Sequence, residues 1–259
     1  MAYEYMTLEK KNRIATITLS RPEVRNQITN ELMEELGGIV ADLEKDNDIR
    51  VVIITATGKA FVAGADLNML LSFSVLEERE CSAMGIKVCQ AIESSKNVYI
   101  CALNGYAFGG GMELAMACDI RIASNKAILG LPETKVGIIP GYGGTQRLTR
   151  LVGFGRAKEI LLTGRNVDAI EAERIGLVNY VTEPDKLMEK TMEEAELLAK
   201  NAPIAMAMAK QTMLQEISVG AAEALYLQAA ALALSYASED ATEGMRAFLE
   251  KREPDFKNK

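Results

Sequence analysis

The sequence predicts an α/β protein that ends in an all-helical region. Short runs of β-branched residues alternate with helical patterns through roughly the first two thirds of the chain, as expected of strands and helices arranged around a sheet. From about Asp185 onward nearly every segment has a helical pattern, and residues 202–238 are rich in alanine and methionine. No apolar run approaches the roughly 20 residues that a membrane-spanning helix needs, so we expect no membrane partner.

The first expected elements are two strands separated by a helix. Residues 14–19 alternate apolar side chains with Thr, which is typical of a half-buried strand. Residues 30–46 carry a helical apolar stripe, with Gly37-Gly38 as a weak point inside it. The β-branched run 51–54 predicts a fully buried strand, followed by a glycine-punctuated loop over 57–64.

The rest of the α/β part continues this alternation. Its expected elements are a mostly helical stretch 70–95, a buried strand 98–103, a short helix 112–117, short strands 120–123 and 127–129, and a helix that opens at 141–144. We therefore divide the chain into an α/β core, residues 1–200, and a C-terminal helical region, residues 201–259.

Composition and charge exclude several classes of function. The chain has 49% hydrophobic and 25% charged residues, which is ordinary for a globular protein. A net charge of −7 argues against a nucleic-acid partner. Its N-terminus lacks the pattern of a signal peptide, so we expect a cytoplasmic protein. We expect all the cysteines to be reduced and buried thiols, and they are Cys81, Cys89, Cys101 and Cys118.

The chain contains no histidine. This excludes Ser-His-Asp and Cys-His catalysis, and it excludes every metal site that needs imidazole ligands. A general acid or base at neutral pH must therefore be a carboxylate, Lys, Tyr or Cys.

Two loops that follow predicted strands have the glycine content of ligand sites. In residues 59–67, small side chains at 63–65 let a ligand approach the backbone, although a tight turn capped by Asp66 is the ordinary interpretation. In residues 104–113, three glycines precede a helix whose free N–H groups suit an anion or a developing oxyanion. Glu113 falls in the first turn of that apolar helix. Two interpretations remain: a carboxylate that faces water, or a buried carboxylate with a chemical role.

A second carboxylate, Glu133, follows Pro132 at the end of a short strand. Alone, it would be interpreted as an exposed loop acid. Together with Glu113 and the two glycine loops it forms a more specific pattern, because paired carboxylates with raised pKa can share acid and base duties on one water. Backbone N–H groups can stabilise an enolate oxygen by about 3–4 kcal/mol per donor.

At these residues the sequence closely resembles the enoyl-CoA hydratase (crotonase) family. The resemblance covers essentially the whole chain, and its motifs are residues 63–67, 104–114, 131–133, 140–148 and 248–252. It implies that the N–H groups of Ala65 and Gly110 form an oxyanion hole for the thioester carbonyl. It also implies that Glu113 and Glu133 hold the catalytic water, one taking a proton from it while the other protonates the α-carbon.

The resemblance further implies a fold, a binding set and an assembly. The fold would be a spiral of ββα units with a helical trimerisation region, commonly assembled as a hexamer, a dimer of trimers. Apart from the coenzyme A that carries the acyl substrate, neither a cofactor nor a metal is implied. The residues expected to bind coenzyme A are Ala63, Ala65, Asp66, Leu67, Asn68 and Gly110, with Phe248 and Lys251 offered by a neighbouring subunit.

Retention of both glutamates favours hydration of a 2-enoyl-CoA over the other reactions of the family. Isomerase branches usually keep one of these acids, and the dehalogenase branch needs a histidine. One departure is Leu131, where many hydratases have Gln, and we expect it to make the pocket wall more apolar and to alter acyl preference. The alternatives are hydration of a cyclic enoyl- or dienoyl-CoA and enoyl-CoA isomerisation.

A different class of function is RNA binding through a lysine-rich helix, as in some relatives. The candidate helix here, residues 78–95, carries Arg79 and Lys87 among more numerous glutamates. With the net charge of −7, we expect no RNA binding.

Overall fold

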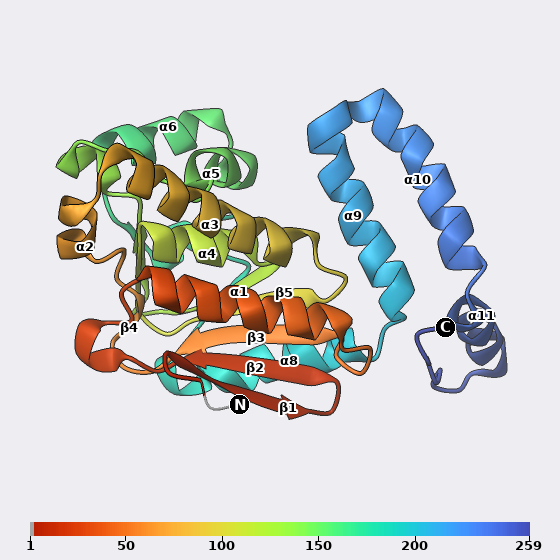
Figure 1. Ribbon diagram of the computed structural model, residues 1–259. Coiled ribbons are helices and arrows are strands. Elements are labelled where there is room, and N and C mark those ends of the chain that lie inside the picture. Colours follow the sequence, from red (N-terminus) through yellow and green to blue (C-terminus); the bar gives the residue numbers. More distant parts are fainter. Residues whose placement is uncertain (1–2) are drawn as a thin grey trace.

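The computed structural model describes residues 3–259, the side chains of residues 217 and 218 excepted, and has two sheets (Figure 1). The larger sheet has the order β1-β2-β3-β5-β7-β10, in which β1 pairs antiparallel with β2 and the other pairs are parallel. Its strands are β1 (Met6–Lys11), β2 (Ile14–Leu19), β3 (Val51–Ala56), β5 (Val98–Leu103), β7 (Ile120–Ser124) and β10 (Tyr180–Thr182). The smaller sheet comprises β4 (Ala60–Val62), β6 (Tyr106–Phe108), β8 (Ile128–Gly130) and β9 (Val167–Asp168).

Strand–strand–helix units follow one another along the chain, which confirms the expected spiral. In successive units the first strand joins the larger sheet and the second, β4, β6 or β8, joins the smaller one. The helices of these units are α1 (Asn30–Lys45), α2 (Leu67–Ser72), α3 (Val75–Ser94), α4 (Gly110–Ala117) and α5 (Gly144–Val152). Further elements are η1 (Pro22–Val24), η2 (Glu133–Val136), α6 (Phe154–Thr163), α7 (Ala169–Arg174) and η3 (Pro184–Lys186).

The expected elements differ from the observed ones where patterns are short or interrupted. Strand β1 was not predicted, because its charged, mostly exposed residues lack alternation, as is common at a sheet edge. The expected helix 70–95 is two helices, α2 and α3, because Ser74 and Glu77 form a capping box that starts a new helix. Conversely, Gly37 does not break α1. A Cβ at Gly37 would lie 3.1 Å from Val88, so the glycine permits close packing against α3.

Helices cover both faces of the larger sheet. Strands β3 and β5 are buried along their whole length, as expected of strands covered on both sides. One face packs in the main core with α1, α3 and α4. The other face packs in a second cluster against α8 (Leu187–Ala199). All four cysteines are buried free thiols, as predicted.

The C-terminal helices extend from the core (Figure 1). They are α9 (Pro203–Val219), α10 (Ala221–Tyr236) and α11 (Glu239–Glu250). Buried Lys210 of α9 anchors them by an ion pair with Asp119, 2.8 Å long, at the end of the sheet. No described helix is long and apolar enough to cross a membrane.

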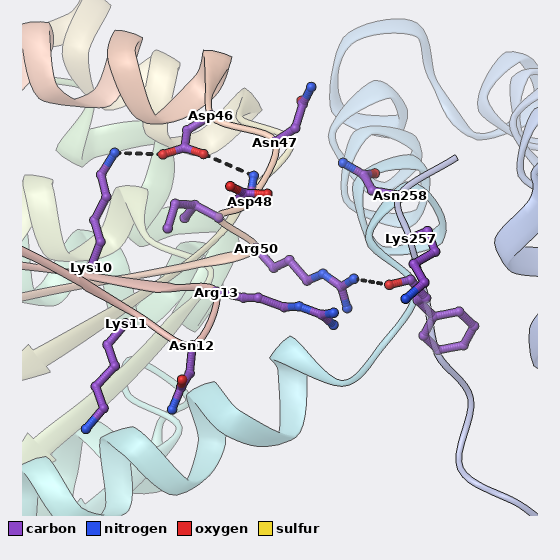
Figure 2. A pocket seen from close by; sticks show the side chains of 12 residues that line it. Lys10, Lys11, Asn12, Arg13, Asp46, Asn47, Asp48, Arg50, Lys257 and Asn258 are labelled. Atoms are coloured by element: carbon purple, nitrogen blue, oxygen red, sulfur yellow. Dashed lines mark hydrogen bonds and ion pairs between the residues drawn. The ribbon is translucent and has the colours of Figure 1, made fainter.

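Arg50, at the start of β3, makes a second attachment. Figure 2 shows its guanidinium reaching the C-terminal tail, where it donates to the carbonyl of Phe256 at 2.6 Å. The same group donates to the carbonyl of Ala199 at 2.9 Å, where α8 ends. One buried cation therefore joins the sheet, the turn that leads to α9 and the tail. The expected division between residues 1–200 and 201–259 falls in this turn and stays a prediction.

Candidate active site

The two glycine loops singled out in the sequence and the segment that holds Glu133 meet at one edge of the smaller sheet. Strands β4, β6 and β8 are neighbouring and parallel, so their carboxyl ends lie at the same edge, where ligands bind in sheets of this kind. The loop after β4 holds residues 63–65, the turn after β6 holds Gly109 and Gly110, and the segment after β8 holds Glu133. A Cβ at Gly109 would lie 3.8 Å from the Cα of Gly64, so the first two segments are in contact.

Two backbone N–H groups are available at this edge. Ile28 donates to the carbonyl of Gly64 at 2.9 Å, and Asp66 donates to the carbonyl of Ile28 at 3.1 Å. Because successive N–H groups alternate in direction along extended backbone, the N–H of Ala65 points away from Ile28. Gly110 is the first residue of α4, so its N–H has no acceptor within the helix.

Gly109 must be a glycine for this geometry. Its φ of 54° and ψ of −126° lie outside the regions that residues with a Cβ adopt. A Cβ there would also lie 3.0 Å from the Oε1 of Glu133. The turn therefore places backbone without a side chain directly beside the carboxylate of Glu133.

Glu113 is almost completely buried, with 2% of its surface exposed, in the first turn of α4 as predicted. Its Oε1 accepts hydrogen bonds from the backbone N–H groups of Tyr142, at 2.7 Å, and Gly144, at 2.6 Å. Burial raises the pKa of Glu113, while these bonds and the charge of Arg147 act in the opposite direction. Of its two oxygens, Oε1 is fixed by the backbone and Oε2 remains for chemistry.

Glu133 begins the short helix η2 and differs from Glu113 in its surroundings. Its Oε2 is buried and has no hydrogen-bond partner among the described residues. Burial raises the pKa of Glu133 to about 7, with a smaller contribution from the negative charge of Glu113 and an opposing one from its own N–H. An orphan buried oxygen is rare in proteins, and a bound water or substrate would satisfy it.

Glu113 and Glu133 line one cavity of about 410 Å³ together with Ala65 and Gly110. Ala63 and Leu67 also line it, and their contact with coenzyme A stays a prediction. Asp66 and Asn68 do not line it. Asp66 instead accepts hydrogen bonds from the N–H groups of Asn68 and Met69 and caps α2, which is the ordinary interpretation of this acid.

The prediction for Leu131 was wrong in its geometry. The side chain is fully buried in the main core and is not part of the cavity wall. Leu131 follows β8 directly and lies two residues after buried Leu129, so it continues the core-facing side of the strand. Pro132 then starts the turn into η2, which breaks this alternation and brings Glu133 to the cavity. Any effect of Leu131 on acyl preference would be indirect.

Phe248 and Lys251 lie on or directly after α11, in the region that extends from the core, and do not line the cavity. Phe248 is 83% exposed. A single chain therefore does not bring these two residues to the predicted site.

Sequence reasoning missed the residues that hold Glu113 in place. Tyr142 lies in the glycine-rich segment before α5 and Gly144 is the first residue of α5. A Cβ at Gly144 would approach the Oε1 of Glu113 to 2.9 Å. Buried Arg147 donates to the carbonyl of Tyr142 at 2.6 Å and pairs with Glu93 at 2.8 Å. The glycines at 141–144 indicated that another group packs closely against this backbone, but nothing in the local sequence identified that group as Glu113.

Titratable groups elsewhere offer no obvious metal site. Within residues 3–259, no group of three or more His, Cys, Asp or Glu side chains is arranged to hold a metal ion. The chemistry available at the cavity is acid–base catalysis by two carboxyl groups beside two backbone donors.

Comparisons with known proteins agree with this geometry. The family model for enoyl-CoA hydratase/isomerase matches residues 9–259. The chain is similar to the short-chain-enoyl-CoA hydratase of Clostridium acetobutylicum and to the crotonyl-CoA hydratase of Syntrophomonas wolfei, each at 41% identity over the full length of both chains. Among solved structures it is similar to an enoyl-CoA hydratase from Bacillus anthracis, with 40% identity, 99% and 100% coverage of the two chains, and a TM-score of 0.95.

Proposed function

Because the chain belongs to the enoyl-CoA hydratase/isomerase family, we propose that it catalyses the reversible hydration of a 2-enoyl-CoA to a 3-hydroxyacyl-CoA. The observation that carries this proposal is the pairing of Glu113 with Glu133 at one cavity. Two carboxyl groups in unlike surroundings can divide the roles of base and acid.

The surroundings of each carboxyl group support an assignment of roles. Two backbone N–H donors favour the ionised form of Glu113, which suits it to take a proton from water as the oxygen attacks the β-carbon. Glu133 lacks a donor at Oε2 and has the higher tendency to be protonated, which suits it to protonate the α-carbon. The N–H groups of Ala65 and Gly110 would stabilise the enolate oxygen in between.

The proton balance of this mechanism predicts the pH dependence. The pair must carry one proton, which is on Glu133 before hydration and on Glu113 after it. Because the pKa of Glu133 is raised to about 7, the pair loses its proton as the pH rises through that value, so kcat/KM should fall above it. The kcat/KM for dehydration should fall over the same pH range. The overall reaction takes up and releases no proton, so the ratio of the forward and reverse kcat/KM does not depend on pH. Rates of crotonyl-CoA hydration from about pH 5 to about pH 9 measure it, and a profile that stays flat to the alkaline end contradicts it.

A panel of substrates tests the reaction itself. We expect loss of the absorbance of the conjugated thioester when the protein is mixed with crotonyl-CoA, at a kcat/KM within the usual enzymatic range of about 10⁴ M⁻¹s⁻¹ or above. The alternatives are read in the same assay. Turnover of a cyclic enoyl-CoA without turnover of crotonyl-CoA, or a gain of absorbance with a 3-enoyl-CoA alone, would replace simple hydration by those reactions.

The proposed partner in assembly is a second copy of the chain, in trimers paired as a hexamer. Helix α10 is apolar around much of its circumference, and a helix of this kind is normally buried. Its exposed apolar residues include Leu225, Tyr226, Leu232 and Leu234, which supports residues 201–259 as the trimerisation region. In such an assembly Phe248 and Lys251 would reach the coenzyme site of a neighbour. We propose no cofactor beyond the substrate's coenzyme A, and a cytoplasmic location.

A further inference from the structure

A second cavity adjoins the one that holds the two glutamates. It has a volume of about 730 Å³ and lies between α3 and the segment 137–146. The side chains and backbone that line both cavities belong to Leu70, Glu78, Ile138, Ile139 and Gly141. These shared residues define the junction between the cavities.

The junction is lined by apolar side chains and one carboxylate. The Oγ of Ser82 donates to the carbonyl of Gly141 at 2.7 Å and ties α3 to the facing segment. A chain that runs from the first cavity into the second passes the shared residues, of which Leu70, Ile138 and Ile139 are apolar. It must also pass Glu78, which is the charged member of the shared set.

Glu78 has no evident structural task at this position. It lies in the first turn of α3, but Ser74 and Glu77 already complete the capping box there. No Lys or Arg side chain among the described residues pairs with it in a salt bridge. The residue is exposed, so its carboxylate is hydrated where it borders the two cavities.

We propose that Glu78 selects the length of the acyl chain by disfavouring apolar tails that extend from the first cavity into the second. This inference rests on the proposed function, because it assigns the acyl substrate to the first cavity. Methylene groups packed against a carboxylate displace its water without offering a hydrogen bond, which costs free energy. A short acyl group ends before the junction and avoids that cost, whereas a long one does not.

The test is a comparison of a short and a long substrate in Glu78→Leu and the unsubstituted protein. We expect the ratio of kcat/KM for 2-decenoyl-CoA to that for crotonyl-CoA to rise by about tenfold, the size expected for relieving one desolvated polar group. Glu78→Gln, which keeps the size and removes the charge, should raise the ratio in the same direction by about threefold. The matched control is Glu80→Leu on the same helix, because Glu80 is exposed as Glu78 is but lines neither cavity, and its ratio should not change.

Binding separates the failure of this inference from failure of the proposed function. Dissociation constants for butyryl-CoA and decanoyl-CoA need no turnover, and their ratio should shift in Glu78→Leu as the kinetic ratio does. If the unsubstituted protein does not hydrate crotonyl-CoA, the proposed function is wrong, but the binding test of Glu78 can still be carried out. The role of Glu78 is overturned if both ratios, long to short substrate in kcat/KM and in dissociation constant, are the same in Glu78→Leu and in the unsubstituted protein.

Discussion

Replacement of Glu133 by Gln should lower kcat for crotonyl-CoA hydration by about 10²- to 10⁴-fold, the usual loss when a general acid is removed. Gln has nearly the same shape as Glu but cannot deliver a proton to the α-carbon. Because the raised pKa of about 7 keeps Glu133 partly neutral at physiological pH, a neutral amide should be tolerated at this site. We therefore expect the melting temperature and the dissociation constant for butyryl-CoA to change little.

The pH profile gives the Glu133→Gln variant a second readout. If Glu133 sets the alkaline limb near pH 7, the residual activity of the variant should lose that limb. Glu80→Gln is a suitable control, because this exposed glutamate lies outside the cavity and should alter neither kcat nor the profile. A Glu133→Gln protein with full activity would exclude the two-carboxylate mechanism.

The sequence located Glu113 more directly than Glu133. A glycine turn before an apolar helix is a local signal, and the structure places Glu113 in that first turn. The meeting of the two acids depends instead on the pairing of β4, β6 and β8, which have three residues each. Strands this short carry no measurable periodicity. The two glutamates were therefore paired by their shared chemistry and by family resemblance, not by a predicted strand pairing.

Tertiary contacts explain what sequence reasoning missed or placed wrongly. The N–H groups of Tyr142 and Gly144 bind Glu113 from a segment about thirty residues further along the chain, and no local rule identifies such a pair. Leu131 was assigned to the pocket wall from its position beside Glu133, yet its side chain lies in the core. Nearness in sequence does not determine the direction of a side chain where a strand ends and a helical turn begins.

Replacement of Glu113 by Gln should also lower kcat by about 10²- to 10⁴-fold, because an amide cannot take a proton from water. The effect on folding should be small for a specific reason. The amide oxygen of Gln can occupy the place of Oε1 and accept both backbone N–H groups, at 2.7 and 2.6 Å. Circular dichroism and binding of butyryl-CoA measure whether the variant keeps its fold and its site, and Glu80→Gln again serves as the control.

The two substitutions should not act independently. Loss of the charge at Glu113 removes one cause of the raised pKa of Glu133, so the pKa of Glu133 should fall in Glu113→Gln. A carboxyl titration followed by NMR would detect this fall. If the two acids act on the same water, the double variant Glu113→Gln/Glu133→Gln should be little slower than either single variant, because each change alone already breaks the proton path. Losses that multiply in the double variant would mean that the two glutamates serve separate steps.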